Sequence, residues 1–164
     1  MTTPASSGAA NRGVRPATEN DIDAIHRLIE IYVPAAILLP RTPEKIREDL
    51  EQTLVYHNQG EVIGVGNLVN YGDNLYEIRG LSVQSQMQGL GVGRALIEGL
   101  LAYLKEKHPE ESIKVFALTY IPDFFKHLGW TVTPKENFPQ KIFKDCEYCA
   151  RKLDCPETAV EIQI

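Results

Sequence analysis

The N-terminal part of the chain carries apolar residues at helical spacing. Ile22, Ile25, Leu28 and Ile29 recur three or four positions apart, which predicts a helix with one buried stripe. Acidic residues surround the start of this stripe, as is usual at the positive end of a helix. The helix should stop at Pro34, because proline cannot continue it.

A second helix is predicted from Thr42-Pro43-Glu44, where a cap residue, a proline and an acidic residue follow one another. Its apolar face would consist of Ile46, Leu50 and Leu54. The strongest helical pattern, rich in leucine, runs from Ala95 to Lys107.

Runs of apolar and β-branched residues predict the strands. They are Val14 to Pro16, Thr53 to His57, Glu61 to Val69, Leu75 to Val83, Lys114 to Tyr120, Trp130 to Thr133 and Cys146 to Leu153. Asn58-Gln59-Gly60 is a hairpin signal, and Pro122 to Leu128 is predicted to be a short helix. Hairpins come first and a β–α–β–α–β series follows, which indicates a single mixed α/β domain over residues 12–164, after a disordered tail at 1–11.

The composition is that of one globular domain, and it argues against two classes of function, nucleic-acid binding and membrane insertion. The 164 residues are 43% hydrophobic and 24% charged, with a formal net charge of -5. An acidic chain lacks the basic footprint of a nucleic-acid binder. No apolar run reaches the roughly 18 residues of a membrane span, and the start of the chain does not resemble a signal peptide. We therefore expect a soluble, cytoplasmic protein that binds neither nucleic acid nor membrane.

A glycine-rich stretch separates the strand that ends at Val83 from the helix that follows. The first N–H groups of a helix have no partners within it, and the helix dipole attracts anions to that end. Glycines would let these groups approach phosphate oxygens closely, and polar side chains at both ends of the stretch would add donors. The candidate pyrophosphate site comprises Gln88, Gly89, Leu90, Gly91, Val92, Gly93 and Arg94.

Two common nucleotide motifs do not fit this stretch. A dinucleotide fingerprint requires G-x-G-x-x-G, whereas Gly89, Gly91 and Gly93 are each separated by one residue. A P-loop requires Gly-Lys-Ser/Thr, which the stretch lacks. A plain helix entry without a ligand is the alternative.

The stretch resembles the phosphate-binding signature of the GCN5-related N-acetyltransferase (GNAT) family. That signature, Gln/Arg-x-x-Gly-x-Gly/Ala, is matched by Gln88, Gly91 and Gly93. Leu81-Ser82-Val83 before it and Phe124 to Trp130 after it also look like the family's strand and short helix. The resemblance implies acetyl-CoA as co-substrate and no catalytic metal.

The resemblance also implies how the fold would hold acetyl-CoA. Members of the family have a mixed sheet, antiparallel in its N-terminal part, whose parallel strands splay apart at the cofactor cleft, with about four flanking helices. Backbone groups of Leu81 and Val83, on either side of Ser82, would pair with the pantetheine arm like an added strand. Dimers are frequent in the family, so a homodimer is compatible with the resemblance.

Glu77 is the candidate general base, acting through a water molecule, because it lies in the strand beside the expected cleft. Its alternative is a carboxylate that faces solvent or pairs with Arg79. Many family members use a tyrosine of the short helix as general acid, but this chain has Phe125 there. Tyr120 is the substitute candidate for the acid, and simple packing is its alternative.

A narrower resemblance concerns the acceptor. Five segments look like the acetyltransferase domain of N-acetylglutamate synthases, namely residues 39–42, 76–83, 116–119, 125–130 and 138–141. This implies the α-amine of L-glutamate as acceptor, and hence the first step of arginine biosynthesis. Arg41 would hold a carboxylate, unless it is a loop residue that faces solvent. Lys141 or Lys144 would supply a second cation; the lysine that longer synthases have at Val69 is missing here.

Other interpretations of the chain stay open. The acceptor could be another small amine, a polyamine or a peptide N-terminus, and Phe125 is also compatible with a sensor that binds acetyl-CoA without turnover. Cys146, Cys149 and Cys155 are best explained as reduced structural thiols. A metal site completed by a residue such as His127, or a redox pair, is the alternative for these cysteines.

Overall fold

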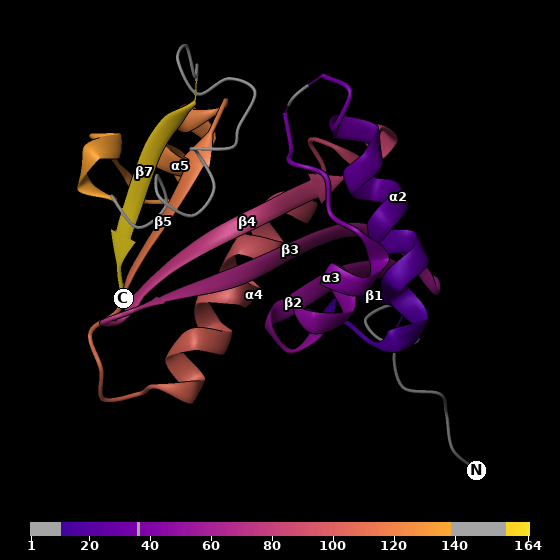
Figure 1. Ribbon diagram of the computed structural model, residues 1–164, viewed down its shortest axis with the longest axis horizontal. Helices are drawn as coiled ribbons and strands as arrows, with labels where there is room; N and C mark the ends of the chain where they lie inside the picture. Colours follow the sequence, from indigo (N-terminus) through magenta and orange to yellow (C-terminus); the bar gives the residue numbers. More distant parts are fainter. Residues whose placement is uncertain (1–10, 36, 139–156) are drawn as a thin grey trace.

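A computed structural model of the protein describes residues 11–35, 37–138 and 157–164. Within these residues one seven-stranded sheet has the order β1-β2-β3-β4-β5-β7-β6 (Figure 1). Its strands are β1 (Arg12–Pro16), β2 (Thr53–Asn58), β3 (Glu61–Gly72), β4 (Leu75–Val83), β5 (Lys114–Thr119), β6 (Thr131–Thr133) and β7 (Thr158–Gln163). Neighbouring strands are antiparallel except β4 and β5, which run parallel. The predicted mixed sheet is therefore confirmed.

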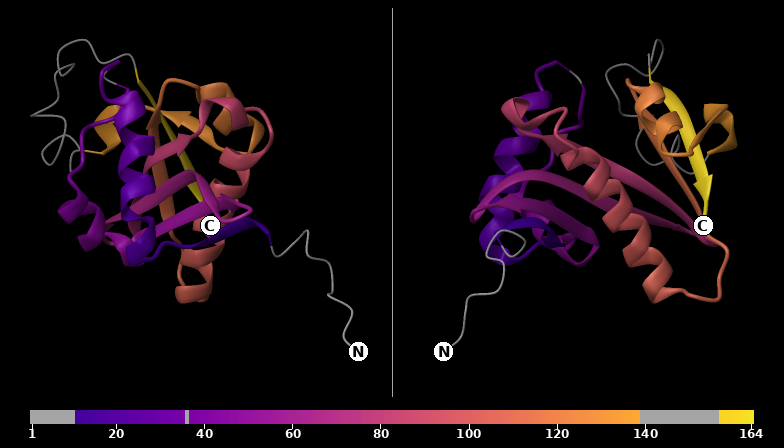
Figure 2. Two further views of the ribbon diagram at one scale, coloured as in Figure 1. Left: turned by 90° about the vertical axis from the view of Figure 1, so that its right-hand side faces the viewer. Right: turned by 180° about the vertical axis from the view of Figure 1, so that it is seen from behind.

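The helices cover both faces of this sheet. They are α2 (Ile22–Tyr32), α3 (Pro43–Glu48), α4 (Val92–Lys107) and α5 (Pro122–His127). The helices α2 and α3 lie on one face of the N-terminal strands and α4 lies on the opposite face (Figures 1 and 2). This arrangement places a separate apolar layer on each side of β2, β3 and β4.

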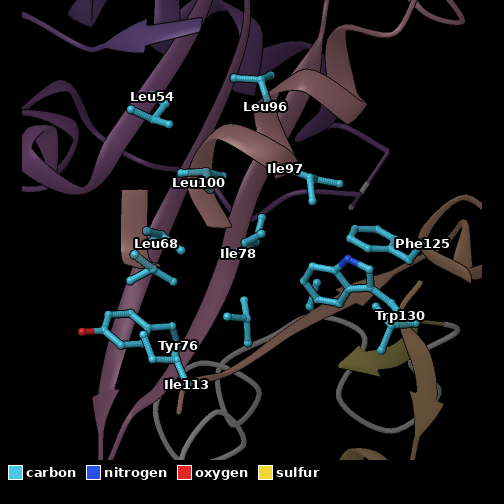
Figure 3. Packing of buried hydrophobic residues seen from close by; sticks show 14 of the residues in the cluster. Leu54, Leu68, Tyr76, Ile78, Leu96, Ile97, Leu100, Ile113, Phe125 and Trp130 are labelled. Carbon is cyan, nitrogen blue, oxygen red and sulfur yellow. The ribbon is translucent and has the colours of Figure 1, made fainter. Parts of the chain in front are cut away.

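Each layer contains the helical stripe that the sequence predicts. On the α2 side, the four predicted residues of the stripe are buried and pack with Val55 and Val65 of the sheet. On the α4 side, Leu96 and Leu100 are fully buried and point toward the strands, where they join Ile78 (Figure 3). Burial of such aliphatic side chains contributes about 1.5–3 kcal/mol each relative to exposure. The two stripes thus pack against β3 from opposite faces of the sheet.

The boundaries of two predicted helices are wrong. Leu54 was expected on the second helix, but α3 ends at Glu48 and Leu54 pairs with Gly66 in the sheet. Strand pairing takes Leu54 because its side chain is buried in the layer under α4. The helix α4 begins at Val92 instead of Ala95, so the end of the glycine stretch is already helical.

The last described strand was not predicted. β7 lies between β5 and β6 and is antiparallel to both. Its sequence, Thr-Ala-Val-Glu-Ile-Gln, covers only six positions and has two adjacent apolar residues, so it shows no clear period-2 alternation. The predicted strand Cys146 to Leu153 lies outside the described residues, as do residues 1–10 of the predicted tail.

Among the described helices, none has the length and apolar character needed to cross a bilayer.

Candidate active site

The strands β4 and β5 separate at Glu77. They pair only at Leu75 with Lys114, Tyr76 with Val115 and Glu77 with Phe116. Beyond these pairs the strands move apart, as the V-shaped arrangement of β4 and β5 shows (Figure 1). A cleft of about 1360 Å³ lies there, lined by β4, the glycine stretch, the ends of α2 and β5, and α5.

The last part of β4 presents its backbone to this cleft. Gly64 and Val83 are opposite each other, and the next ladder bond runs from the Gln84 N–H to the Ile63 carbonyl, 2.8 Å away. Gly64 and Val83 are therefore a non-hydrogen-bonded pair, whose own polar groups point away from each other. The N–H and C=O of Val83 consequently face away from β3, where an extended ligand can pair with them.

The glycine stretch lines the other end of the cleft. Gly89 and Gly91 have φ values of 81° and 86°, which residues with a side chain rarely adopt, and Gly91 is the N-cap of α4. Gly93 has a different role, because a Cβ there would lie 3.4 Å from the Phe124 ring. The unpaired N–H groups of the first turn of α4 are thus left open to an anion.

The remaining residues of this predicted phosphate site differ in position. Gln88 and Arg94 line the cleft, and Arg94 also pairs with Glu98 at 2.8 Å. The Leu90 side chain is exposed, whereas the Val92 side chain is buried in the core. Leu90 and Val92 can therefore contribute only main-chain groups to a bound phosphate.

Tyr32 is a residue of the cleft that the sequence did not reveal. It ends α2, and its hydroxyl donates a hydrogen bond to the Val83 carbonyl at 2.5 Å. The Gln88 side-chain amide donates to the Tyr32 hydroxyl at 2.7 Å and lies 3.3 Å from the Val83 carbonyl. No local pattern at the end of a helix predicts a contact 51 residues away.

Glu77 is buried where the two strands part. Its Oε1 atom accepts hydrogen bonds from the Tyr71 hydroxyl at 3.0 Å and from Arg79 Nε and Nη2 at 3.1 and 2.9 Å. The side chain of Glu77 is 3% exposed and that of Arg79 is 20% exposed, and both residues line the cleft. The alternative that Glu77 faces solvent is therefore wrong, and its pairing with Arg79 is confirmed.

Arg41 is held in the same cleft by two partners. Its Nη2 donates to Asp49 Oδ2 at 2.9 Å, and its Nη1 donates to Asn67 Oδ1 at 3.2 Å. Burial lowers the pKa of Arg41, Asp49 opposes this effect, and the nearby charge of Arg79 lowers the pKa further. A guanidinium nevertheless stays charged at neutral pH. Arg41 is thus a buried cation of the cleft, and the alternative of a solvent-facing loop residue is wrong.

Gly80 makes room for this arginine. It lies at a bulge of β4 with a φ of 65°, and a Cβ there would lie 3.3 Å from Asn67 Oδ1 and 3.5 Å from Arg41 Nη1. Asn67 is in turn the cross-strand partner of Arg79. The bulge therefore brings Arg41 and Arg79 to one wall of the cleft.

The candidate acid lies in the cleft, whereas the other predicted residues lie in the core or outside the described part of the chain. Tyr120 follows β5 directly and lines the cleft. Phe125 is buried and packs edge-on against Trp130, with ring centres 5.0 Å apart (Figure 3). Lys141, Lys144 and the cysteines lie outside the described residues. Within the described part of the chain, no three metal-binding side chains lie close enough to hold an ion.

Comparison with known families agrees with this geometry. A family model described as an acetyltransferase (GNAT) domain matches residues 35–147. An uncharacterized N-acetyltransferase of Chlorobaculum tepidum is 39% identical over 152 residues, which cover 93% of this chain and 96% of that protein. An amino-acid acetyltransferase of Mycobacterium tuberculosis is 31% identical over 121 residues, covering 72% of this chain and 67% of that protein.

Solved structures show the same fold. The N-acetylglutamate synthase of Neisseria gonorrhoeae, complexed with coenzyme A and N-acetyl-glutamate, superposes with a TM-score of 0.80 at 22% identity. The match covers 93% of this chain but only 35% of the Neisseria chain. A Mycobacterium tuberculosis protein in complex with CoA and NLQ has a TM-score of 0.75 at 26% identity, covering 92% of this chain and 98% of that one. The chain therefore belongs to the GNAT family and is an acetyl-CoA-dependent N-acetyltransferase.

Proposed function

We propose that this enzyme acetylates the α-amine of a free acidic amino acid, and that L-glutamate is its acceptor. The observation that carries the proposal is the burial of Arg41 and Glu77 in one cleft beside the glycine stretch. A buried guanidinium suits a carboxylate, and a buried carboxylate suits an amine that must lose a proton. The amino-acid acetyltransferase of Mycobacterium tuberculosis, a relative at 31% identity, supports an amino acid as the acceptor.

The cleft offers a place for each part of acetyl-CoA. The N–H groups at the start of α4, with Gln88 and Arg94, suit the pyrophosphate. The outward-facing backbone of Val83, with Leu81 two residues before it, suits the pantetheine arm, which would run along β4 past Ser82. An arm that follows β4 from the glycine stretch brings the thioester toward Glu77, where β4 and β5 separate.

The chemistry then requires two proton movements. The acceptor arrives as an ammonium ion, and Glu77, directly or through a water molecule, takes one proton to give the neutral amine. Its nitrogen attacks the thioester carbonyl, so that a C–N bond forms and the C–S bond breaks. The second proton passes to the leaving thiolate, and Tyr120 is the candidate donor because Phe125 has no hydroxyl. The products are an N-acetylamino acid and coenzyme A; with L-glutamate this is the first step of arginine biosynthesis, in the cytoplasm.

One further residue and one rival function complete the proposal. Lys141 is proposed as an additional cation for the acceptor, from its resemblance to the synthases alone. A sensor that binds acetyl-CoA without turnover is the second candidate function, and the observation in its favour is the apolar Phe125 in the short helix.

The direct test is thiol release from acetyl-CoA with twenty amino acids and several polyamines as acceptors. We expect turnover with L-glutamate, a loss of about 10²-fold or more for Glu77→Gln, and a higher KM for glutamate with Arg41→Ala. Arg47→Ala is the matched control, because Arg47 is an exposed arginine that pairs with Glu19 at 3.0 Å on the surface. Turnover of polyamines alone would contradict the acceptor, and cofactor binding without any turnover would establish the sensor.

A further inference from the structure

The pairing of Glu77 with Arg79 has the layout of a receptor for an α-amino acid. In such a molecule the amine and the carboxylate are attached to one carbon, so the groups that bind them must lie side by side. Arg79 Nη2 and Glu77 Oε1 are 2.9 Å apart, and the i, i+2 spacing along β4 puts both side chains on the same face. An anion and a cation are thus presented together on the wall of the cleft.

We infer that Arg79 is the specificity-determining residue that binds the α-carboxylate of the acceptor, beside Glu77, which receives the α-amine. The inference rests on the proposed function and makes it more specific. Arg41 then binds the second, side-chain carboxylate. The acceptor class is accordingly a free α-amino acid with a distal acid group.

The order of the groups within the wall supports this assignment. Glu77 lies deeper than Arg79, with side-chain exposures of 3% and 20%. An acceptor that places its amine at the point where β4 and β5 part would therefore bring the adjacent carboxylate to the more exposed Arg79. Tyr71 braces the pair, because its hydroxyl accepts from Arg79 Nη2 at 3.0 Å and donates to Glu77.

The position of Arg41 supports the second half of the assignment. Asn67 accepts from Arg41 and is the cross-strand partner of Arg79, so the Arg79 side chain projects from the same face of the sheet as the amide that holds Arg41. Two guanidinium groups in one partly desolvated cleft repel each other, and the charge of Arg79 lowers the pKa of Arg41. An acceptor with two carboxylates relieves that repulsion, whereas a polyamine adds to it.

The arrangement also disfavours acceptors that share only the amine. A peptide N-terminus has an amide where a free amino acid has its α-carboxylate, and a polyamine has neither. Neither offers Arg79 a carboxylate in addition to that of Glu77. Hydrogen bonds to charged groups are worth about 1.5–3 kcal/mol, which corresponds to roughly a 10- to 150-fold preference for the free acid.

The experiment compares three acceptors that differ by one group: L-glutamate, its α-amide (isoglutamine) and its side-chain amide (glutamine). We expect the wild type to prefer glutamate over both amides in kcat/KM by at least about 10-fold. Arg79→Gln should lower the preference over isoglutamine to within a few-fold and leave the preference over glutamine. Arg41→Gln should do the reverse, and Arg79→Lys should restore part of the α-carboxylate preference, because it keeps the charge.

The acceptor preferences of the variants show whether Arg79 determines specificity or only supports the structure of the site. If Arg79 only held Glu77 in place, Arg79→Gln would lower turnover of all three acceptors equally, and this result would overturn the inference. Equal use of glutamate and isoglutamine by the wild type would overturn it as well, even if Arg79→Gln failed to fold. Turnover of no free amino acid would overturn both this inference and the proposed function, whereas glutamate turnover with an unchanged preference would overturn the inference alone.

Discussion

The hydroxyl of Tyr32 lies 2.5 Å from the main-chain oxygen of Val83, so the end of α2 is tied to the strand that borders the cleft. The main chain of Tyr32 is tied as well, because its carbonyl accepts the N–H of Ile37 at 3.1 Å. Ile37 begins the described segment that leads to Arg41. Tyr32 therefore links the end of β4 at Val83 to the segment that leads to Arg41.

Tyr32→Phe should bind acetyl-CoA more tightly than the wild type. The Tyr32 hydroxyl and the Gln88 amide occupy the Val83 carbonyl that we assign to the pantetheine arm, so the cofactor has to displace them. Removal of the hydroxyl takes away one competing hydrogen bond, worth about 1 kcal/mol, and should lower the Kd about 5-fold. Isothermal titration calorimetry with coenzyme A measures this.

The matched control is Tyr103→Phe. The Tyr103 hydroxyl also donates to a main-chain carbonyl, that of Glu51 at 2.8 Å, but Tyr103 does not line the cleft. This variant should leave the Kd unchanged. Weaker binding by Tyr32→Phe would contradict the prediction and would mean that the hydroxyl contacts the bound cofactor.

Gly80→Ala should damage the acceptor site specifically. At a φ of 65° an alanine is strained by about 1–2 kcal/mol, and its Cβ would press on Asn67 and Arg41. We expect a lower melting temperature and a KM for the acceptor raised about 10-fold or more, with the KM for acetyl-CoA little changed. Steady-state kinetics with each substrate varied in turn measures the difference.

Gly60→Ala is the control for Gly80→Ala. Gly60 also has a positive φ, 83°, but a Cβ there would have no neighbour within 4 Å. Gly60→Ala should lower the melting temperature about as much as Gly80→Ala does, without a change in the KM for the acceptor. Equal effects of the two variants on KM would show that strain, and not the approach to Arg41, is responsible.

The fold should lose stability in acid through Asp21. Arg15 donates to both Asp21 oxygens, at 2.7 and 2.9 Å, and the Thr18 N–H adds a bond of 2.8 Å. The hydrogen bond from Arg15 is the main reason that the pKa of Asp21 lies below its ordinary value of 3.8. The carboxylate therefore stabilises the fold above that pH, and this contribution disappears as the pH falls through the lowered pKa.

Urea unfolding between pH 2 and 7 measures this contribution. Asp21→Asn should be less stable than the wild type at neutral pH and should converge with it in acid. Asp23→Asn is the control, because Asp23 is exposed on the first turn of α2. A constant gap between Asp21→Asn and the wild type at every pH would contradict the prediction.

The sequence contained enough local information for most of the fold. The stripe from Ile22 to Ile29, the strand Leu75 to Val83 and the glycine-rich entry to α4 are each recognisable within about ten residues, and all three are confirmed as local structure. Tyr32 could not be found in this way, because its partners are far along the chain and only the folded sheet brings them together.

Glu77 and Arg79 show a different limit of prediction from the sequence. Their i, i+2 spacing indicated a pairing, but it did not show that the pair is buried where two strands part. The proximity of Arg79 to Arg41 was even less accessible, because it depends on the bulge at Gly80 and on the register of β3 with β4. Both facts follow from tertiary structure alone.

The position of β7 has a consequence for the order of folding during synthesis. Until residues 158–163 leave the ribosome, the outer edge of β5 has no partner, and β5 is attached to β4 by only three residue pairs. β6 has to wait in the same way, because its ladder is made with β7. The N-terminal strands and α4 can assemble earlier, so the far wall of the cleft is among the last parts of the enzyme to form. A nascent chain should therefore be folded around α2 and α4 before it can capture its first molecule of acetyl-CoA.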